Sequence, residues 1–254
     1  VPKEVRKVEN GAFNQTQLTR ILFEEYDKND PNYGKALLEL GAGELTDSTV
    51  STLGDRTYAV VSLPGDMRTG YKGNLTLIRL PSHLKGLGAL SLYGTANVEF
   101  NLDAHLELIG ASALAGNNVT QLSLPAVKHI GAGAFANNTK MTKITFHPNS
   151  TFSSVGPYAF ASCTKLGAIS IPNNVTTIGE YAFDKCTGIT KITLTANTLE
   201  DYCKSKINGS LYSAGTSAPR TLVIAGEEVK DLVIPNTIDS IYDKAFYACE
   251  KLTS

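Results

Sequence analysis

The stretch Ile169–Cys186, which reads ISIPNNVTTIGEYAFDKC, decides the fold of this chain because its pattern recurs. The copies align on the phenylalanine of an Ala-Phe pair, which falls at Phe135, Phe160, Phe183 and Phe246. Successive steps are 25, 23 and 63 residues, and the last step contains an insertion. A period of roughly 20 to 50 residues indicates a solenoid of stacked units rather than one central core.

Each copy joins two short elements through a turn. An apolar-x-apolar pair such as Ile169 and Ile171 has the period of two that is typical of a β-strand with alternate side chains facing inward. The proline that often follows ends the strand because it has no backbone N–H to donate to a neighbouring strand. The remaining Gly-x-x-Ala-Phe-x-x-Cys segment has room for about one turn of helix on the opposite face. Stacking buries the apolar side of every unit, so we expect Phe160 and Phe183 to be buried and in contact.

The repeat resembles that of the BspA-like branch of the leucine-rich-repeat proteins, whose units read much like IPxxVTxIGxxAFxxC. The match is specific over about 98–254 and weaker before it. The string LVIAGEEVKDLVIP, from Leu222 to Pro235, also looks like a connector of that family. The resemblance implies an α/β fold, a right-handed leucine-rich-repeat solenoid of stacked strands and short helix or turn units. It also implies a bacterial surface or secreted protein, and some members of the family are adhesins.

The first part of the chain does not repeat, and we expect residues 1–42 to form a small helical N-terminal cap. Asn14 followed by Gln17 looks like a helix N-cap with a reciprocal glutamine, and Asp30-Pro31 looks like the start of a second helix. The apolar stripes of the two expected helices are Leu18, Ile21 and Leu22, and Ala36, Leu37 and Leu40. Such a cap covers the open edge of the first turn. The alternative is the tail of a separate upstream module.

The solenoid is expected to occupy 43–254, in four parts. These are degenerate turns over 43–97, regular turns over 98–194, an insertion over 195–221 and a last turn over 222–254. In the degenerate part the apolar triplets that end at Leu80 and Leu92 crowd together, which predicts turns that lack most of the Ala-Phe segment. In the insertion, Thr198 is the expected cap of a short helix over 199–204. The insertion is either a functional projection or a tolerated connector, and the sequence favours neither.

Three of the four cysteines, Cys163, Cys186 and Cys249, stand three residues after a repeat phenylalanine, where earlier turns have Asn117 and Asn138. This interchange of Cys and Asn indicates a buried ladder in which a small side chain bonds the backbone of a neighbouring turn. The sequence contains no C-x-x-C pair, which is the spacing typical of a metal site. A secreted chain could carry disulfides, but we expect Cys163 and Cys186 to be free thiols.

Composition and motifs narrow the function. The chain has 23 basic and 24 acidic residues and no basic block, which argues against nucleic acid as a partner. It has no apolar run near the ~18 residues of a membrane span, and VPKEVRKVEN is no signal peptide, so secretion needs a leader removed before this numbering. It has no H-E-x-x-H, G-x-S-x-G or Walker loop. We therefore expect no enzyme, no metal and no cofactor, and we expect His129, between inward Val127 and Ile130, to point outward.

The residues that are not needed for stacking face the surface of the solenoid. The outward strand residues and the insertion supply the candidate binding surface: Gln121, Ser123, Lys143, Thr145, Ser170, Lys191, Thr193, Tyr202 and Tyr212. Repeat arrays use such extended faces for binding, and exposed tyrosine supplies contact area at low entropic cost. The simpler interpretation is a sheet face kept polar for solubility, and the residue types fit both.

Three functions compete. The leading hypothesis is a non-catalytic, secreted or cell-surface binding scaffold, a monomer that recognises a protein or glycan in adhesion. The alternative is a structural spacer or stalk that displays another domain at the cell envelope. The third is an enzyme whose site lies between the insertion and the solenoid face. Binding predicts an exposed aromatic or charged patch, a spacer predicts none, and an enzyme predicts a pocket of titratable groups with perturbed pKa values.

Overall fold

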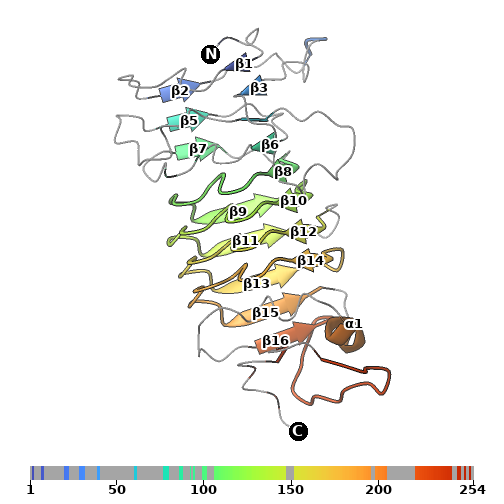
Figure 1. Ribbon diagram of the computed structural model, residues 1–254. Helices are drawn as coiled ribbons and strands as arrows, with labels where there is room; N and C mark the ends of the chain where they lie inside the picture. The colour runs from blue at the N-terminus through green and yellow to red at the C-terminus, as the bar shows by residue number, and fades with distance from the viewer. Residues whose placement is uncertain are drawn as a thin grey trace.

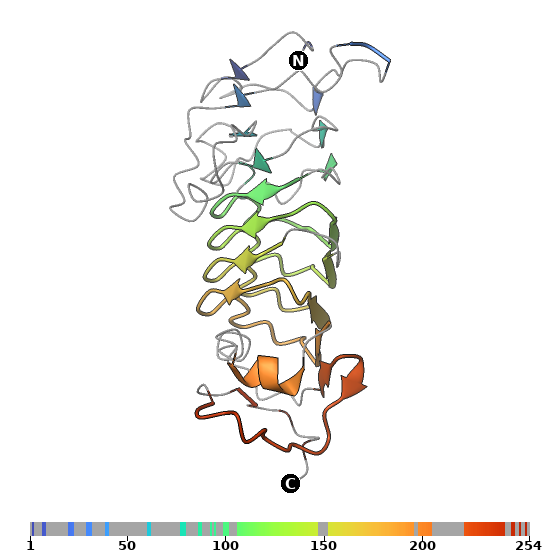
Figure 2. The same ribbon diagram turned by 90° about the vertical axis from the view of Figure 1, so that its right-hand side faces the viewer.

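The computed structural model is an elongated stack of turns, with β1 near one end and β16 near the other (Figure 1). It describes residues 2, 7–8, 20–22, 29–31, 39–40, 60–61, 77–79, 86–87, 92, 94, 99–101, 106–146, 152–195, 198–204, 221–241, 245–246, 249 and 252. Turned by 90°, the same stack keeps its order, with α1 (Leu199–Lys204) at the level of the last turns (Figure 2).

The longest sheet follows the stack from one turn to the next. Its strands are parallel and in spatial order are β1 (Lys7–Val8), β3 (Glu39–Leu40), β4 (Val60–Val61), β6 (Gly86–Leu87), β8 (Leu108–Ile109), β10 (His129–Ile130), β12 (Ser154–Val155) and β14 (Thr177–Ile178). Each strand is only two residues long, so its stability comes from its neighbours in the stack rather than from its own length.

A second side of the stack carries longer strands. They are β9 (Gln121–Leu124), β11 (Lys143–Phe146), β13 (Ala168–Ile171), β15 (Lys191–Leu194), β16 (Thr221–Ile224) and β17 (Glu227–Glu228), of which only β17 runs antiparallel. A three-stranded sheet of β2 (Arg20–Leu22), β5 (Leu77–Arg79) and β7 (Glu99–Asn101) occupies the N-terminal part. Along β9, β11, β13 and β15 every second residue is buried, as the period of two predicts.

The third side of each turn is the Ala-Phe segment, which forms turns rather than the short helix we expected. The residues two before and two after the repeat phenylalanine have left-handed φ values, for example 55° at Tyr158 and 61° at Ser162. Backbone N–H groups here donate to the next turn, as Phe160 N does to Ala182 O at 2.7 Å. A helix would keep those bonds within its own segment, so the inter-turn ladder displaces it.

A glycine opens this third side because two turns approach closely there. A Cβ on Gly179 would lie 2.3 Å from Pro157 N, and one on Gly156 would lie 2.5 Å from Ala132 N. The same approach lets Gly179 N donate to Val155 O at 2.8 Å. The Ile-Gly pair of the repeat is therefore a requirement of stacking as well as of the turn.

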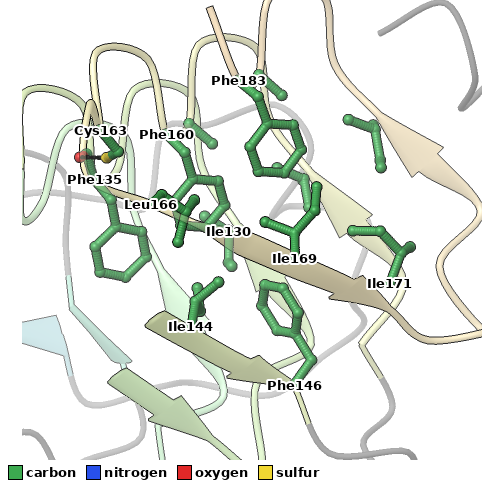
Figure 3. Packing of buried hydrophobic residues seen from close by; sticks show 14 of the residues in the cluster. Ile130, Phe135, Ile144, Phe146, Phe160, Cys163, Leu166, Ile169, Ile171 and Phe183 are labelled. Carbon is green, nitrogen blue, oxygen red and sulfur yellow. Dashed lines mark hydrogen bonds between the residues drawn. The ribbon is translucent and has the colours of Figure 1, made fainter. Parts of the chain in front are cut away.

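The core is a column of phenylalanines that runs through the stack (Figure 3). Phe160 stacks on Phe135 with ring centroids 5.2 Å apart and on Phe183 at 5.3 Å, each pair with an interplanar angle of 5°. All three side chains are fully buried. The predicted contact between Phe160 and Phe183 is confirmed. Phe146 adds an edge-on contact to Phe160 at 6.5 Å.

The Asn and Cys ladder is also confirmed. Asn117 Nδ2 donates to Leu92 O and Asn138 Nδ2 donates to Leu114 O, both at 2.8 Å. In the next turns the thiols take the same place: Cys163 Sγ donates to Phe135 O at 3.3 Å, and Cys186 Sγ donates to Phe160 O at 3.0 Å. All four cysteines are free and buried, so no disulfide joins adjacent turns.

The helical cap expected over 1–42 is wrong where the structure describes it. Arg20–Leu22, inside the first expected helix, is strand β2, and Glu39–Leu40, inside the second, is strand β3. Short apolar runs fit a strand as well as a helix, and pairing with β5 and β4 supplies ladder hydrogen bonds that local pattern cannot count. The capping residues Asn14 and Gln17 lie outside the described residues, and Asp30-Pro31 lies in a bend and turn.

The turn that ends at Leu92 is not shortened. Leu87 aligns with Ile109 in the eight-stranded sheet, and Leu92 N donates to Ala113 O at 2.8 Å, as a residue of the phenylalanine column does. Its repeat step to Leu114 is therefore 22 residues, close to that of the later turns. Our pattern assigned Leu87 and Leu92 to one strand because leucine fills both kinds of position.

Candidate functional site

The strands β9, β11, β13 and β15 lie side by side (Figure 1), and the exposed positions that alternate with their buried ones hold seven of the nine predicted surface residues. They are Gln121, Ser123, Lys143, Thr145, Ser170, Lys191 and Thr193, all exposed or half-exposed. The register places them in two rows. One runs from Gln121 through Lys143 and Ala168 to Lys191, and the other is Ser123, Thr145, Ser170 and Thr193. We call these seven residues the strand face.

The strand face has a low charge density. Its two lysines stand two strands apart with Ala168 between them, so their Cα atoms are roughly 9–10 Å apart. Neighbouring hydroxyls are used by the backbone: Thr142 Oγ1 donates to Thr120 O at 3.0 Å, and Thr190 Oγ1 donates to Gly167 O at 3.2 Å. Part of the threonine content therefore has a structural cause, because these side chains bond the previous turn.

Tyr202 does not belong to a surface. Its side chain is 1% exposed, its hydroxyl donates to Ala245 O, and its ring lies edge-on to Phe246 at 5.5 Å. The cause is the amphipathic face of α1, where Leu199, Tyr202 and Cys203 recur at helical spacing and pack inward. That spacing was readable in the sequence. Tyr212 lies outside the described residues.

The predicted start of α1 is confirmed. Asp201 N donates to Thr198 Oγ1 at 3.0 Å, and Thr198 N donates back to Asp201 Oδ2 at 3.2 Å. This reciprocal pair is a capping box. Since Thr221 on β16 pairs directly with Lys191 on β15, the insertion leaves from and returns to adjacent turns.

His129 is 2% exposed, so the expectation that it faces solvent is wrong. Its Nδ1 lies 2.6 Å from Ser154 Oγ on the neighbouring strand. A serine next to a histidine is part of many hydrolase sites, but burial of the imidazole makes this pair a contact between adjacent turns.

The thiols of Cys163 and Cys203 have raised pKa values. Burial raises the pKa of the Cys203 thiol. The hydrogen bond with the neighbouring Cys186 is the largest cause that raises the pKa of Cys163, and burial is the second. These shifts keep the thiols protonated and unreactive.

The exposed aromatic patch of the described chain is one that the repeat pattern did not single out. Tyr158 is 47% exposed and Tyr181 is 43% exposed, and their rings stack with centroids 5.2 Å apart and planes at 17°. Each stands two residues before a phenylalanine of the column, in the strings PYAF and EYAF. The recurrence of tyrosine at one position of two adjacent copies was the available signal. We call this pair the tyrosine ledge.

The charges around the tyrosine ledge are balanced. Glu180 and Lys185 are exposed and Asp184 is half-buried on the segment that carries Tyr181, and Lys165 is exposed after the segment that carries Tyr158. The chain next to the two tyrosines therefore carries two carboxylates and two ammonium groups. Within the described ranges, no three His, Cys, Asp or Glu side chains are grouped as a metal site, and no helix has the length and apolar character of a membrane span.

Comparisons with known proteins agree with this architecture. The family described as BspA type leucine rich repeat region matches residues 70–153 and 223–254, in six copies. The intervening part carries turns in the same register, because β11, β13 and β15 pair in series. A comparison with curated proteins found no match.

Solved structures of bacterial repeat proteins are similar to the chain. A leucine rich cell surface protein from Faecalibacterium prausnitzii A2-165 is 17% identical with a TM-score of 0.55, over 98% of this chain and 76% of that one. Leucine-rich repeat proteins from Eubacterium ventriosum ATCC 27560 (17% identity, TM-score 0.39, 97% and 68% of the two chains) and Bacteroides ovatus ATCC 8483 (15%, 0.38, 100% and 70%) also match. Only the first is close enough to indicate a shared fold. Six matched copies show that residues 70–153 and 223–254 are leucine-rich repeats of the BspA type, and the parallel turns between them continue the same stack.

Proposed function

We propose that this chain is a non-catalytic binding module of a secreted or surface-displayed bacterial protein. The observation that carries the proposal is the tyrosine ledge, because a spacer gains nothing from two half-exposed aromatic rings. The repeat type and the cell-surface protein from F. prausnitzii with the same fold support the location. The ligand contacts the tyrosine ledge, the strand face or both, and the module acts as a monomer.

The test is binding by the parent protein to an array that holds both extracellular-matrix proteins and glycans. We expect at least one partner to be retained, and we expect size-exclusion chromatography with light scattering to give the monomer mass. A double variant, Lys143→Ala with Lys191→Ala, removes the charge of the strand face. Both side chains are exposed, so its melting temperature should equal that of the parent.

The spacer is the second candidate, and the regular series of ladders from β9 to β16 favours it. A stack in which every turn bonds both neighbours is suited to holding another domain away from an envelope. It predicts that the parent binds nothing on the array. That result would replace the binding proposal with the spacer.

A further inference from the structure

The two rings of the tyrosine ledge are exposed, whereas the phenylalanine rings of the regular turns are buried. Phe135, Phe146, Phe152, Phe160 and Phe183 are all buried, since stacking removes apolar rings from water. Tyr158 and Tyr181 instead occupy a position at which the two preceding turns have a serine and a glycine. The outer edge of the stack therefore does not need an aromatic ring there.

The backbone at this position also disfavours tyrosine. Ser112, Gly133, Tyr158 and Tyr181 have φ values of 52°, 61°, 55° and 57°. Left-handed backbone suits glycine and asparagine, whereas a bulky residue there is an outlier. The left-handed conformation itself belongs to the repeat, since it recurs at this position in all four turns, and hydrogen bonds between the turns hold it in place. Two adjacent turns keep tyrosine in spite of this cost.

The backbone that carries the two rings is held by hydrogen bonds between the turns. Tyr158 N donates to Glu180 O at 3.1 Å, and two residues later Phe160 N donates to Ala182 O at 2.7 Å. Beneath them Phe160 and Phe183 stack at 5.3 Å. A ligand therefore does not have to order the backbone of the two tyrosines on binding, which lowers the entropic cost.

One ring face at the ledge is left without a side chain from the adjacent turn. Tyr158 stacks on Tyr181 on one side. On the other side the same register position is Gly133, which has no side chain. The ring face of Tyr158 on the side of Gly133 is thus the face on which a ligand can stack, and the hydroxyl edge of each half-exposed ring is beside it.

The size and charge of the ledge select the class of ligand. Half of a tyrosine is on the order of 100 Å², so both rings offer roughly 200 Å², whereas one side of a standard protein interface buries about 800 Å². The carboxylates and ammonium groups of the neighbouring chain are equal in number, so this part of the surface has no net charge that would attract an ion, and such groups can bond hydroxyls. An aromatic face with polar groups at its rim fits a ring that is apolar on its face and hydroxylated at its edge.

We propose that the tyrosine ledge binds a pyranose ring of a neutral glycan, with the C–H face of the sugar stacked on Tyr158 and its hydroxyls bonded at the rim. Sugar C–H groups carry partial positive charge and meet the negative face of the ring. The proposal rests on the proposed binding function and names its ligand class.

The experiment titrates the folded chain with neutral oligosaccharides of hexoses and N-acetylhexosamines, first on an array and then by calorimetry for the best probe. The double variant Tyr158→Asn with Tyr181→Asn removes both rings and puts in each place a residue that tolerates left-handed backbone. It should melt no lower than the parent and lose about tenfold or more in affinity. Tyr158→Phe keeps the ring and should retain most of the affinity.

Val233→Ala is the matched control, because it removes exposed apolar surface outside both the tyrosine ledge and the strand face, and it should bind the glycan like the parent. Equal glycan affinity of the asparagine variant and the parent overturns the proposal. So does a parent that binds no neutral glycan; if that parent still binds a protein, the proposed binding function stands and only the ligand class is wrong. Loss of protein binding alone in the asparagine variant makes the ledge a protein contact and also overturns it.

Discussion

Removal of Phe160 tests the stacking argument most directly. This ring is fully buried, stacks on phenylalanines of both adjacent turns, and meets the edge of Phe146. Substitution of a buried phenylalanine by alanine costs about 3–5 kcal/mol. Because two stacked neighbours lose their partner at once, we expect Phe160→Ala near the upper end of that range. A change of this size lowers the melting temperature by about 10–20 °C in a chain of this length.

The assay is urea and thermal unfolding followed by circular dichroism. Turns of a solenoid contact only their neighbours, so a broken central turn should also lower the slope of unfolding free energy against urea, or split the transition in two. Tyr158→Asn is the matched control, since it deletes an aromatic ring two residues away on the outside of the same turn. A Phe160→Ala protein that melts with the parent would refute the column as the main stabiliser.

Three further predictions concern the ladder and the insertion. Cys163 and Cys186 should not react with a thiol reagent in the folded protein, and both should react after denaturation. The folded pKa of Cys163 is raised above its ordinary value of 9.0, so its contribution to the unfolding free energy is present below pH 9 and declines as the pH rises further. Cys163→Ala should therefore reduce the decline of the unfolding free energy above pH 9. Asn138→Ala should cost about 2–4 kcal/mol in urea unfolding, since it deletes hydrogen bonds to Leu114 O, Phe135 O and Val119 N in a buried site, and a loss under 1 kcal/mol would contradict the ladder. Tyr202→Phe should cost about 1 kcal/mol by loss of the bond to Ala245 O and leave ligand binding unchanged; weaker binding at equal stability would return Tyr202 to the functional surface.

Some properties of this protein follow from local pattern alone. The step between Ala-Phe pairs determines the stack, and a period of two determines which strand residues face inward, as at Ile169 and Ile171. The cysteine register determines the ladder, and Thr198 the start of α1. These predictions hold because in a repeat array each unit has the same neighbours, so a local pattern repeated is already a description of the tertiary contacts.

Other properties were decided only by the assembled structure. Residues 20–22 and 39–40 are strands because partners far along the chain complete their hydrogen bonds, and Tyr202 is buried because α1 turns toward Ala245. The strand face follows from alternation, but the tyrosine ledge does not. The pattern around Tyr158 and Tyr181 shows a position of the repeat, whereas their exposure depends on left-handed backbone that turns both side chains out of the stack. Periodicity in the sequence shows which residues recur, and only the tertiary structure determines which of these recurring residues are exposed to solvent.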